Sequence, residues 1–145
     1  PNAEYVVQRP EGETAFSGVS KSYRTEIFDV VQRSGQLQLI EGSDALSSEI
    51  SFELTGGHCE YHQVFHILSG GKHAFFGGDI LPEPEQLQRN FVAKYDFDGK
   101  LARDLRTEYG HKAADGDWIC LFYHSKNIAI GRVQESQGNF KITEA

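Results

Sequence analysis

Three histidines recur at intervals of four residues in the stretch LTGGHCEYHQVFHI: His58, His62 and His66. On a helix this spacing would place all three in one row, as a metal site could use. The apolar residues around Val64 and the two glycines before His58 instead favour a strand. In a strand, His62 and His66 flank Val64 on one face and cannot both join His58. We therefore expect His58 to be a candidate ligand, His62 to support it by hydrogen bonding, and His66 to be structural.

Two further polar residues share the sequence context of His58, the end of an expected strand. They are Asp79, which also follows two glycines, and His124, which closes an apolar run. Loops after strands often carry sites, and glycines let the backbone approach another group closely. Two imidazoles and a carboxylate suit zinc as ligands. The alternative, that each residue is hydrogen-bonded at the surface, stays open at this point.

Cys59 and Ser125 each follow one of these histidines and carry side chains that can act as nucleophiles, but we expect both to have structural roles. Cys59 follows His58, and adjacent strand residues point to opposite faces, so we expect a buried structural thiol rather than a ligand or nucleophile. Ser125 follows His124, and sequence neighbours rarely have the hydrogen-bond geometry that activates a hydroxyl.

The other polar residues that could bind a metal are expected to have structural roles or to face solvent. Asp96 and Asp98 precede a helical pattern, so helix capping is favoured over a calcium loop, whose later ligands are missing. His73 and His111 are expected to be solvated.

The elements that must position these residues follow from the period of the apolar residues. Strands are expected over residues 4–8, 36–42, 49–57 and 117–124, and in two hairpins over 63–79 and 127–143. Helices are expected over 17–32, and from Asp96 or Asp98 to Gly110 or Gly116. Residues 80–99, which include Pro82 and Pro84, are expected to form a surface loop. This order predicts an α+β fold.

The length, net charge and cysteine content of the chain exclude some classes of protein. A chain of 145 residues is sufficient for one domain, and we take residues 1–145 as a single unit. The net charge of -7 and the absence of a basic stripe argue against nucleic acid as a partner, and no apolar run is long enough for a membrane helix. Cys59 and Cys120 suggest reduced thiols in a cytoplasmic protein, with a single bridge as the alternative.

The ordered segments LTGGHCEYHQ, GGD, FDGKLARDLR and FYH resemble the C-terminal half of the metallo-β-lactamase superfamily of hydrolases. Members typically carry Thr-Pro-Gly-His-x-x-Gly-His, which residues 55–62 match with Gly56 in place of proline and Tyr61 in place of the last glycine. Asp79 lies 21 residues after His58 and His124 lies 45 after Asp79, spacings similar to those of lactonase-like and glyoxalase II-like members. The resemblance covers essentially the whole chain.

The resemblance implies part of a four-layer αββα sandwich and a two-metal hydrolase. By analogy His58 would bind the first metal and His124 the second, with Asp79 bridging them as the catalytic carboxylate and His62 in support. The metals would be zinc, with iron or manganese as alternatives. The substrate would be a small molecule with an ester, lactone, thioester or amide carbonyl. Pro82 stands where lactonase-like members often have a tyrosine, which argues against lactone specificity.

The family's His-x-His-x-Asp-His motif, which supplies four of seven metal ligands, does not occur in this sequence. PNAEYVVQR looks like the strand that follows this motif, so we expect the motif to precede Pro1 and the chain to be the C-terminal portion of a longer domain. Three ligands for two metals are too few, so the chain alone should bind metal poorly and be inactive.

Such a half would expose an apolar sheet face, to be covered by the N-terminal half of the same protein or by a second copy in a homodimer. Two alternatives to the enzyme therefore remain, a non-catalytic binding or assembly module and a self-associating inactive fragment.

Overall fold

The computed structural model describes residues 2–88 and 91–145. The chain divides into two compact units, the first ending at Gly42 and the second running from Ser43 to Ala145. Each unit has its own sheet. No helix in the described ranges is long and apolar enough to cross a membrane.

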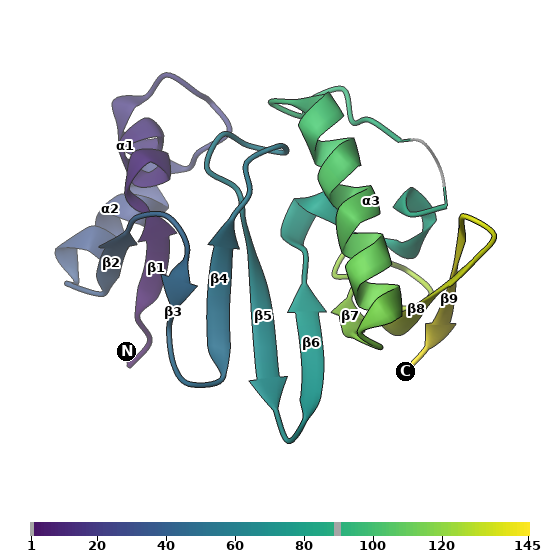
Figure 1. The fold of residues 1–145 in the computed structure, drawn as a ribbon. Coiled ribbons are helices and arrows are strands. Elements are labelled where there is room, and N and C mark those ends of the chain that lie inside the picture. Colours follow the sequence, from purple (N-terminus) through teal and green to yellow (C-terminus); the bar gives the residue numbers. More distant parts are fainter. Residues whose placement is uncertain (1, 89–90) are drawn as a thin grey trace. The chain divides into compact units, whose positions relative to one another are not determined.

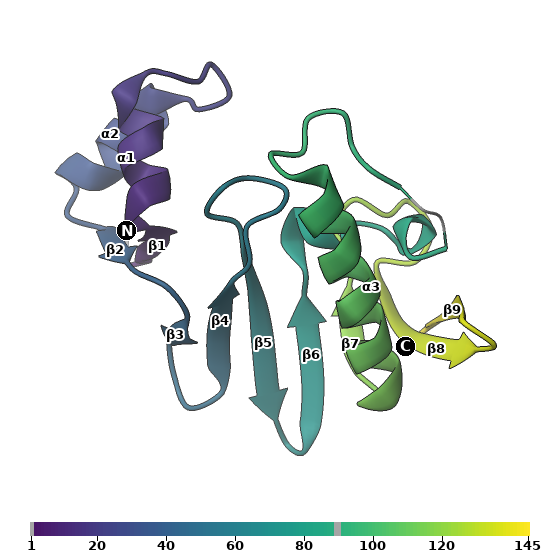
Figure 2. The same ribbon diagram turned by 45° about the horizontal axis from the view of Figure 1, so that its top comes forward.

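The first unit is a two-stranded parallel sheet with two helices (Figure 2). Strand β1 (Tyr5–Gln8) pairs in parallel with β2 (Leu37–Ile40), and helices α1 (Arg9–Ser17) and α2 (Thr25–Arg33) connect them. Both strands confirm the sequence prediction.

The helix expected over 17–32 is wrong in its bounds. Only α2 lies in this range and it begins at Thr25, whereas α1 ends at Ser17, where Gly18 adopts a left-handed conformation with φ of 71°. Pro10 lies in the first turn of α1, where its missing N–H is no loss, so it begins a helix as well as ending a strand.

The second unit is a mostly antiparallel sheet of seven strands in sequence order (Figure 1). The strands are β3 (Asp44–Ala45), β4 (Ile50–Leu54), β5 (Gln63–Ser69), β6 (Lys72–Phe76), β7 (Ile119–Leu121), β8 (Ile130–Ser136) and β9 (Asn139–Glu144). The β6–β7 pair is parallel, and helix α3 (Gly99–Asp115) lies in the connection between these strands. The expected α+β class is confirmed.

Both predicted hairpins are present, and each turns on residues with positive φ. Gly70 and Gly71 join β5 to β6 with φ of 57° and 74°, while Gln137 and Gly138 join β8 to β9 with φ of 52° and 75°. These values suit the two-residue turns that match the twist of antiparallel strands.

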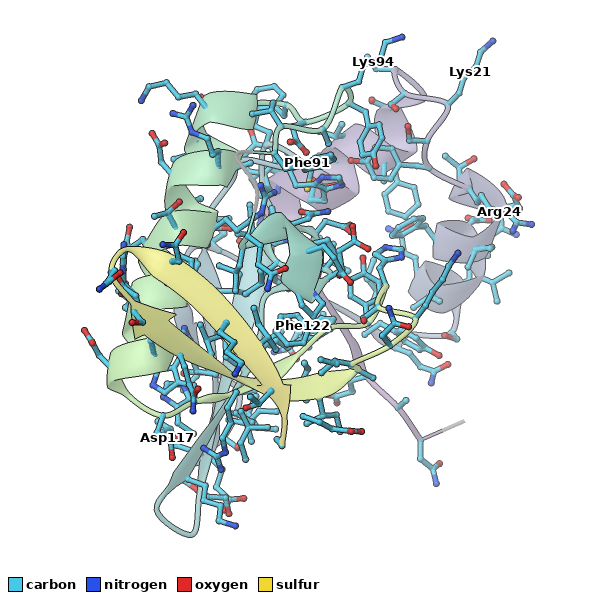
Figure 3. The ribbon with its side chains drawn as sticks, turned by 90° about the vertical axis from the view of Figure 1, so that its right-hand side faces the viewer. Lys21, Arg24, Phe91, Lys94, Asp117 and Phe122 are labelled. Atoms are coloured by element: carbon cyan, nitrogen blue, oxygen red, sulfur yellow. The ribbon has the colours of Figure 1, made fainter. Side chains whose placement is uncertain are left out.

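Helix α3 packs on one face of the large sheet, and the core lies between them (Figure 1). The rings of Phe75 and Tyr109 lie 4.7 Å apart across this interface. Phe122, which is labelled in Figure 3, is fully buried in the same cluster. The buried positions of α3 include Ala102, Arg106 and Tyr109. Leu101, one turn before Leu105 in the sequence pattern, is 39% exposed.

The opposite face of this sheet carries an apolar row. Strand register places Phe52, Phe65, Phe76, Leu121 and Ile130 next to one another across five strands. Phe52 is buried, whereas Ile130 is 50% exposed. What covers this face in the intact protein stays a prediction.

Two predictions about connecting segments need correction. Residues 80–99 are not simply a surface loop, because Ile80, Leu81 and Leu87 are buried in the core and two short 3-10 turns, η1 (Gly78–Ile80) and η2 (Pro84–Gln86), shape the segment. The strand expected over 117–124 is limited to β7, so the chain leaves the sheet before His124.

Helix α3 begins where the sequence suggested. The Asp98 side chain caps it by accepting a hydrogen bond from the backbone N–H of Leu101 at 2.9 Å.

Gly57 fixes the approach of α3 to the turn before His58. It has φ of 87°, and an added Cβ would lie 3.1 Å from the Cα of Ala102. We predict that Gly57→Ala lowers the free energy of unfolding by at least about 1 kcal/mol more than Gly138→Ala, because overpacking adds to the backbone strain. Gly138 is the matched control, since it has φ of 75° but open space around it. Urea unfolding of both variants measures the difference, and equal losses would show that the close approach is unimportant.

Candidate functional site

The structure brings His58, Asp79 and His124 together. His58 lies in the turn between β4 and β5, Asp79 in η1 after β6, and His124 after β7. One oxygen of Asp79, Oδ2, lies 3.3 Å from Nε2 of His58. The other oxygen, Oδ1, lies 3.3 Å from Nε2 of His124. The carboxylate therefore presents a different oxygen to each imidazole.

His62 holds the backbone of Asp79 rather than another side chain of the site. Its Nε2 accepts a hydrogen bond from the Asp79 backbone N–H at 3.1 Å, and its Nδ1 lies 3.0 Å from Oγ1 of Thr55. Because Nε2 accepts, Nδ1 carries the proton and donates to Thr55. Gly78 permits this close contact, since a Cβ there would lie 2.7 Å from His62 Nε2.

Asp96 supports His58 and was missed in the sequence, where it was considered a helix cap. Its Oδ1 lies 3.0 Å from Nδ1 of His58, its Oδ2 accepts from the Ala93 N–H at 2.9 Å, and its side chain is 1% exposed. A carboxylate on Nδ1 fixes the proton there and leaves Nε2, which faces Asp79, as a lone-pair donor.

No local signal in the sequence identifies this pair, because 38 residues separate its members. Two backbone hydrogen bonds bring the segments together. The N–H of Phe97 donates to the carbonyl of His58 at 3.0 Å, and the N–H of Asp98 donates to that of Gly57 at 2.8 Å.

Arg106 ties the loops of the site to α3. It is 3% exposed, and its Nε and Nη1 donate to the carbonyls of Ile80 and Phe91 at 2.7 and 2.8 Å. These carbonyls belong to the segments that carry Asp79 and Asp96, so one buried guanidinium restrains both. Burial lowers the pKa of Arg106, and the nearby Asp96 carboxylate opposes that shift.

Tyr123 also belongs to the site. In a strand its side chain would point away from that of His124, but β7 ends at Leu121 and the alternation ends with it. The Tyr123 hydroxyl donates to Oδ1 of Asp79 at 2.6 Å, and its ring lies 4.2 Å from the His124 ring. Burial and the Asp79 carboxylate raise the pKa of Tyr123, so its hydroxyl stays a donor at neutral pH.

A pocket of about 260 Å³ opens beside these residues. It is lined by ten side chains, which include His58, Asp79, His124, Glu83, Asp96 and Arg106. The lining is mostly polar, as expected of a site that binds polar groups or ions.

The donor set fits part of a two-metal centre. Within the described residues no group of three or more His, Cys, Asp or Glu side chains is arranged to hold a metal ion. Neutral imidazoles and a carboxylate are nevertheless suitable ligands, and the two oxygens of Asp79 face different imidazoles. This arrangement fits two ions that share the carboxylate. It fits a single ion bound by all three residues less well, because the two imidazoles face different oxygens.

The remaining candidates lie outside this arrangement. Cys59 and Cys120 form no disulfide bond in the described part of the chain. Cys59 is half-buried rather than buried, whereas Cys120 is buried and burial raises its pKa to about 12. The Ser125 hydroxyl accepts from the backbone N–H of Ile128 at 3.1 Å, a structural role in a turn. His111 is exposed, as predicted, and bonds to Glu135.

Solved structures with the same fold are metal-dependent hydrolases. A probable metal-dependent hydrolase from Staphylococcus aureus matches 99% of this chain with a TM-score of 0.81 and 24% identity. Hydrolase AbOPH of the beta-lactamase superfamily matches 100% with a TM-score of 0.82 and 18% identity. The fold is therefore that of part of a β-lactamase superfamily hydrolase. No family model matches the chain, and no curated protein does.

A third neighbour is AidC, a dizinc quorum-quenching lactonase in complex with a product, with a TM-score of 0.73, 17% identity and full coverage of this chain. The chain spans about half the length of these structures, 53%, 56% and 55% respectively. The metallo-β-lactamase fold expected from the sequence is thus confirmed for this part of the domain.

The burial of His62 predicts a dependence of stability on pH. Burial, followed by the charge of His58, lowers the pKa of His62 from 6.5 to about 4. As the pH falls, His62 therefore becomes protonated near pH 6.5 in the unfolded chain but only near pH 4 in the folded chain. We predict that stability falls across this window, by up to about 3 kcal/mol from this residue.

Urea unfolding of His62→Gln at several pH values tests this expectation. The variant should lose less stability than the unchanged protein between pH 6.5 and 4, and the exposed His111→Gln should behave like the unchanged protein. Equal pH dependence in all three proteins would contradict the assignment.

Proposed function

We propose that the protein to which this chain belongs is a metal-dependent hydrolase that cleaves an acyl bond at a carbonyl. The observation that carries the proposal is the Asp79 carboxylate, with Oδ2 toward His58 and Oδ1 toward His124. The fold shared with metal-dependent hydrolases supports it.

In this proposal His58 and His124 would each hold one divalent ion, and Asp79 would be the ligand that both ions share. Zinc is the metal that imidazole and carboxylate ligands favour, and the description of AidC as a dizinc lactonase agrees with that choice. Two such ions would supply Lewis-acid polarisation of the carbonyl and an activated water.

The side chains around Asp79 would then have distinct tasks. Asp96 accepts from Nδ1 of His58, so in the neutral imidazole the lone pair of Nε2 would be directed at the site. Tyr123 donates to Oδ1 and restrains the carboxylate plane, and its exposed ring can also contact a substrate. His62 accepts a hydrogen bond from the Asp79 backbone N–H, which would hold the carboxylate in place between the two ions.

The remaining ligands would come from a segment before Pro1, since this chain contains no His-x-His-x-Asp-His motif. The same preceding half would cover the apolar row of the large sheet. We propose a small acyl compound, an ester, lactone, thioester or amide, as substrate. Two cysteines without a disulfide bond between them fit a reducing compartment, and a cytoplasmic location is part of the same proposal.

Replacing the bridging carboxylate tests the function. In the full-length, zinc-loaded protein, Asp79→Ala should abolish hydrolysis of a panel of ester, thioester and lactone substrates, because neither ion keeps its shared ligand. His62→Ala should cost less, since it removes support rather than a ligand. The exposed Asp115→Ala is the control and should retain full activity. Hydrolysis that survives in Asp79→Ala would refute the assignment, and a full-length protein with no zinc-dependent hydrolysis would favour a non-catalytic module.

Asp96 can be tested through metal affinity. We predict that Asp96→Asn weakens zinc binding by the full-length protein about 10- to 100-fold, because the amide no longer fixes the proton on Nδ1 of His58. Competition with a chromogenic chelator measures the dissociation constant for zinc. Asp98→Asn is the matched control, since asparagine also caps a helix and Asp98 does not contact His58 through its side chain. Equal affinities for the two variants would remove Asp96 from the site.

A further inference from the structure

A second group of side chains with nitrogen and oxygen donors lies on the α3-covered face of the large sheet. Glu53 on β4, His66 on β5 and His73 on β6 form a line across three neighbouring strands. Nδ1 of His66 lies 3.0 Å from Nε2 of His73, and Nε2 of His66 lies 3.5 Å from Oε2 of Glu53. None of the three lines the pocket described above. His73 is therefore not simply solvated, as its sequence position suggested.

The nearby carboxylate favours one tautomer of His66. Glu53 carries a negative charge 3.5 Å from Nε2 of His66 and can only accept, so it favours a proton on that nitrogen. Nδ1 of His66 is then left with its lone pair directed at His73, and the proton of the His–His hydrogen bond belongs to Nε2 of His73. The two facing nitrogens thus share one proton.

The separation of these nitrogens also suits a shared ion. Two imidazole nitrogens that are each about 2.0–2.1 Å from one zinc-like ion lie roughly 3.0–3.4 Å apart for ligand–metal–ligand angles of about 90–110°. The observed 3.0 Å falls at the short end of this range. Glu53 behind His66 would complete the carboxylate–histidine–metal arrangement that orients many metal-binding histidines.

Aromatic side chains hold both rings in place. The Trp118 ring lies against that of His73, with centroids 4.0 Å apart and planes tilted by 42°, and contacts His66 edge-on at 5.5 Å. Phe75 lies 5.2 Å from His66. Burial, followed by the neighbouring His66, lowers the pKa of His73, so this imidazole is neutral at physiological pH, as a ligand must be.

We propose that His66 and His73 form a binding site for a divalent transition-metal ion, distinct from the site around Asp79. The ion replaces the hydrogen bond between Nδ1 of His66 and Nε2 of His73. The His73 proton moves through solvent from Nε2 to Nδ1 of the same ring, so both ligands are neutral imidazoles and no net proton is released. Two imidazoles from adjacent strands supply two ligands and water fills the other positions, so the ion exchanges readily and clamps the β5–β6 hairpin. Nitrogen ligands select a borderline ion such as Ni²⁺, Cu²⁺ or Zn²⁺ over Mg²⁺.

Trp118 is the only tryptophan in the sequence, so it reports on this site directly. We use Ni²⁺ as the probe, because a paramagnetic ion held beside the indole quenches its fluorescence. The background is the chain with His58→Ala and His124→Ala, which removes both imidazoles that flank Asp79. In this background Ni²⁺ should quench Trp118 saturably and raise the melting temperature, whereas Mg²⁺ should do neither.

Single substitutions assign the ligands. His66→Gln and His73→Gln should each abolish the saturable response, and Glu53→Gln should weaken it about tenfold through lost orientation of His66. His111→Gln, which removes an exposed histidine bonded to Glu135, should leave it unchanged. Circular dichroism checks that each variant is folded. The substitution at His73 should disturb the fold less than that at His66, because His73 lies near the hairpin turn. Saturable Ni²⁺ binding that survives in both His66→Gln and His73→Gln, or no saturable response in the background, would overturn the proposal whatever the outcome at Asp79.

Discussion

The arrangement of the candidate site depends on how the Asp79 carboxylate is held. Its backbone N–H donates to His62, one oxygen receives the Tyr123 hydroxyl and faces His124, and the other oxygen faces His58. A carboxylate so restrained from three directions has little freedom to rotate. This restraint places the two imidazoles on opposite oxygens, and the proposed sharing of two metal ions follows from it.

The rest of the second unit can be understood as support for this group. The parallel connection from β6 to β7 carries α3 across the sheet and returns the chain beside Asp79, which brings His124 within reach. The buried guanidinium of Arg106 joins α3 to the carbonyls of Ile80 and Phe91. A charged side chain is rarely buried unless it is hydrogen-bonded, and here its bonds fix two loops that carry site residues.

The sequence was informative where a local pattern controls the structure. The alternating apolar residues predicted both hairpins, and Asp98 was one of the two residues predicted to begin α3. The positions of His58, Asp79 and His124 at strand ends indicated that they could meet. Asp96 could not be found this way, because its contact with His58 depends on how a long loop docks.

Local patterns were less informative in three places. His73 is not simply solvated, because it contacts His66 on the neighbouring strand. The Tyr123 side chain reaches Asp79 because β7 ends at Leu121. Helix α1 was not expected, although Pro10 lies in its first turn, where proline is favourable. In the first two cases a tertiary contact or the end of an element overrode the local pattern.

The most direct test of the central claim is the location of metal in crystals of the full-length, zinc-loaded protein by anomalous scattering at the zinc edge. The account predicts two peaks, one bound by Nε2 of His58 and one by Nε2 of His124, with the Asp79 carboxylate between them. Zinc bound elsewhere in the protein, with none in contact with Asp79, would contradict it.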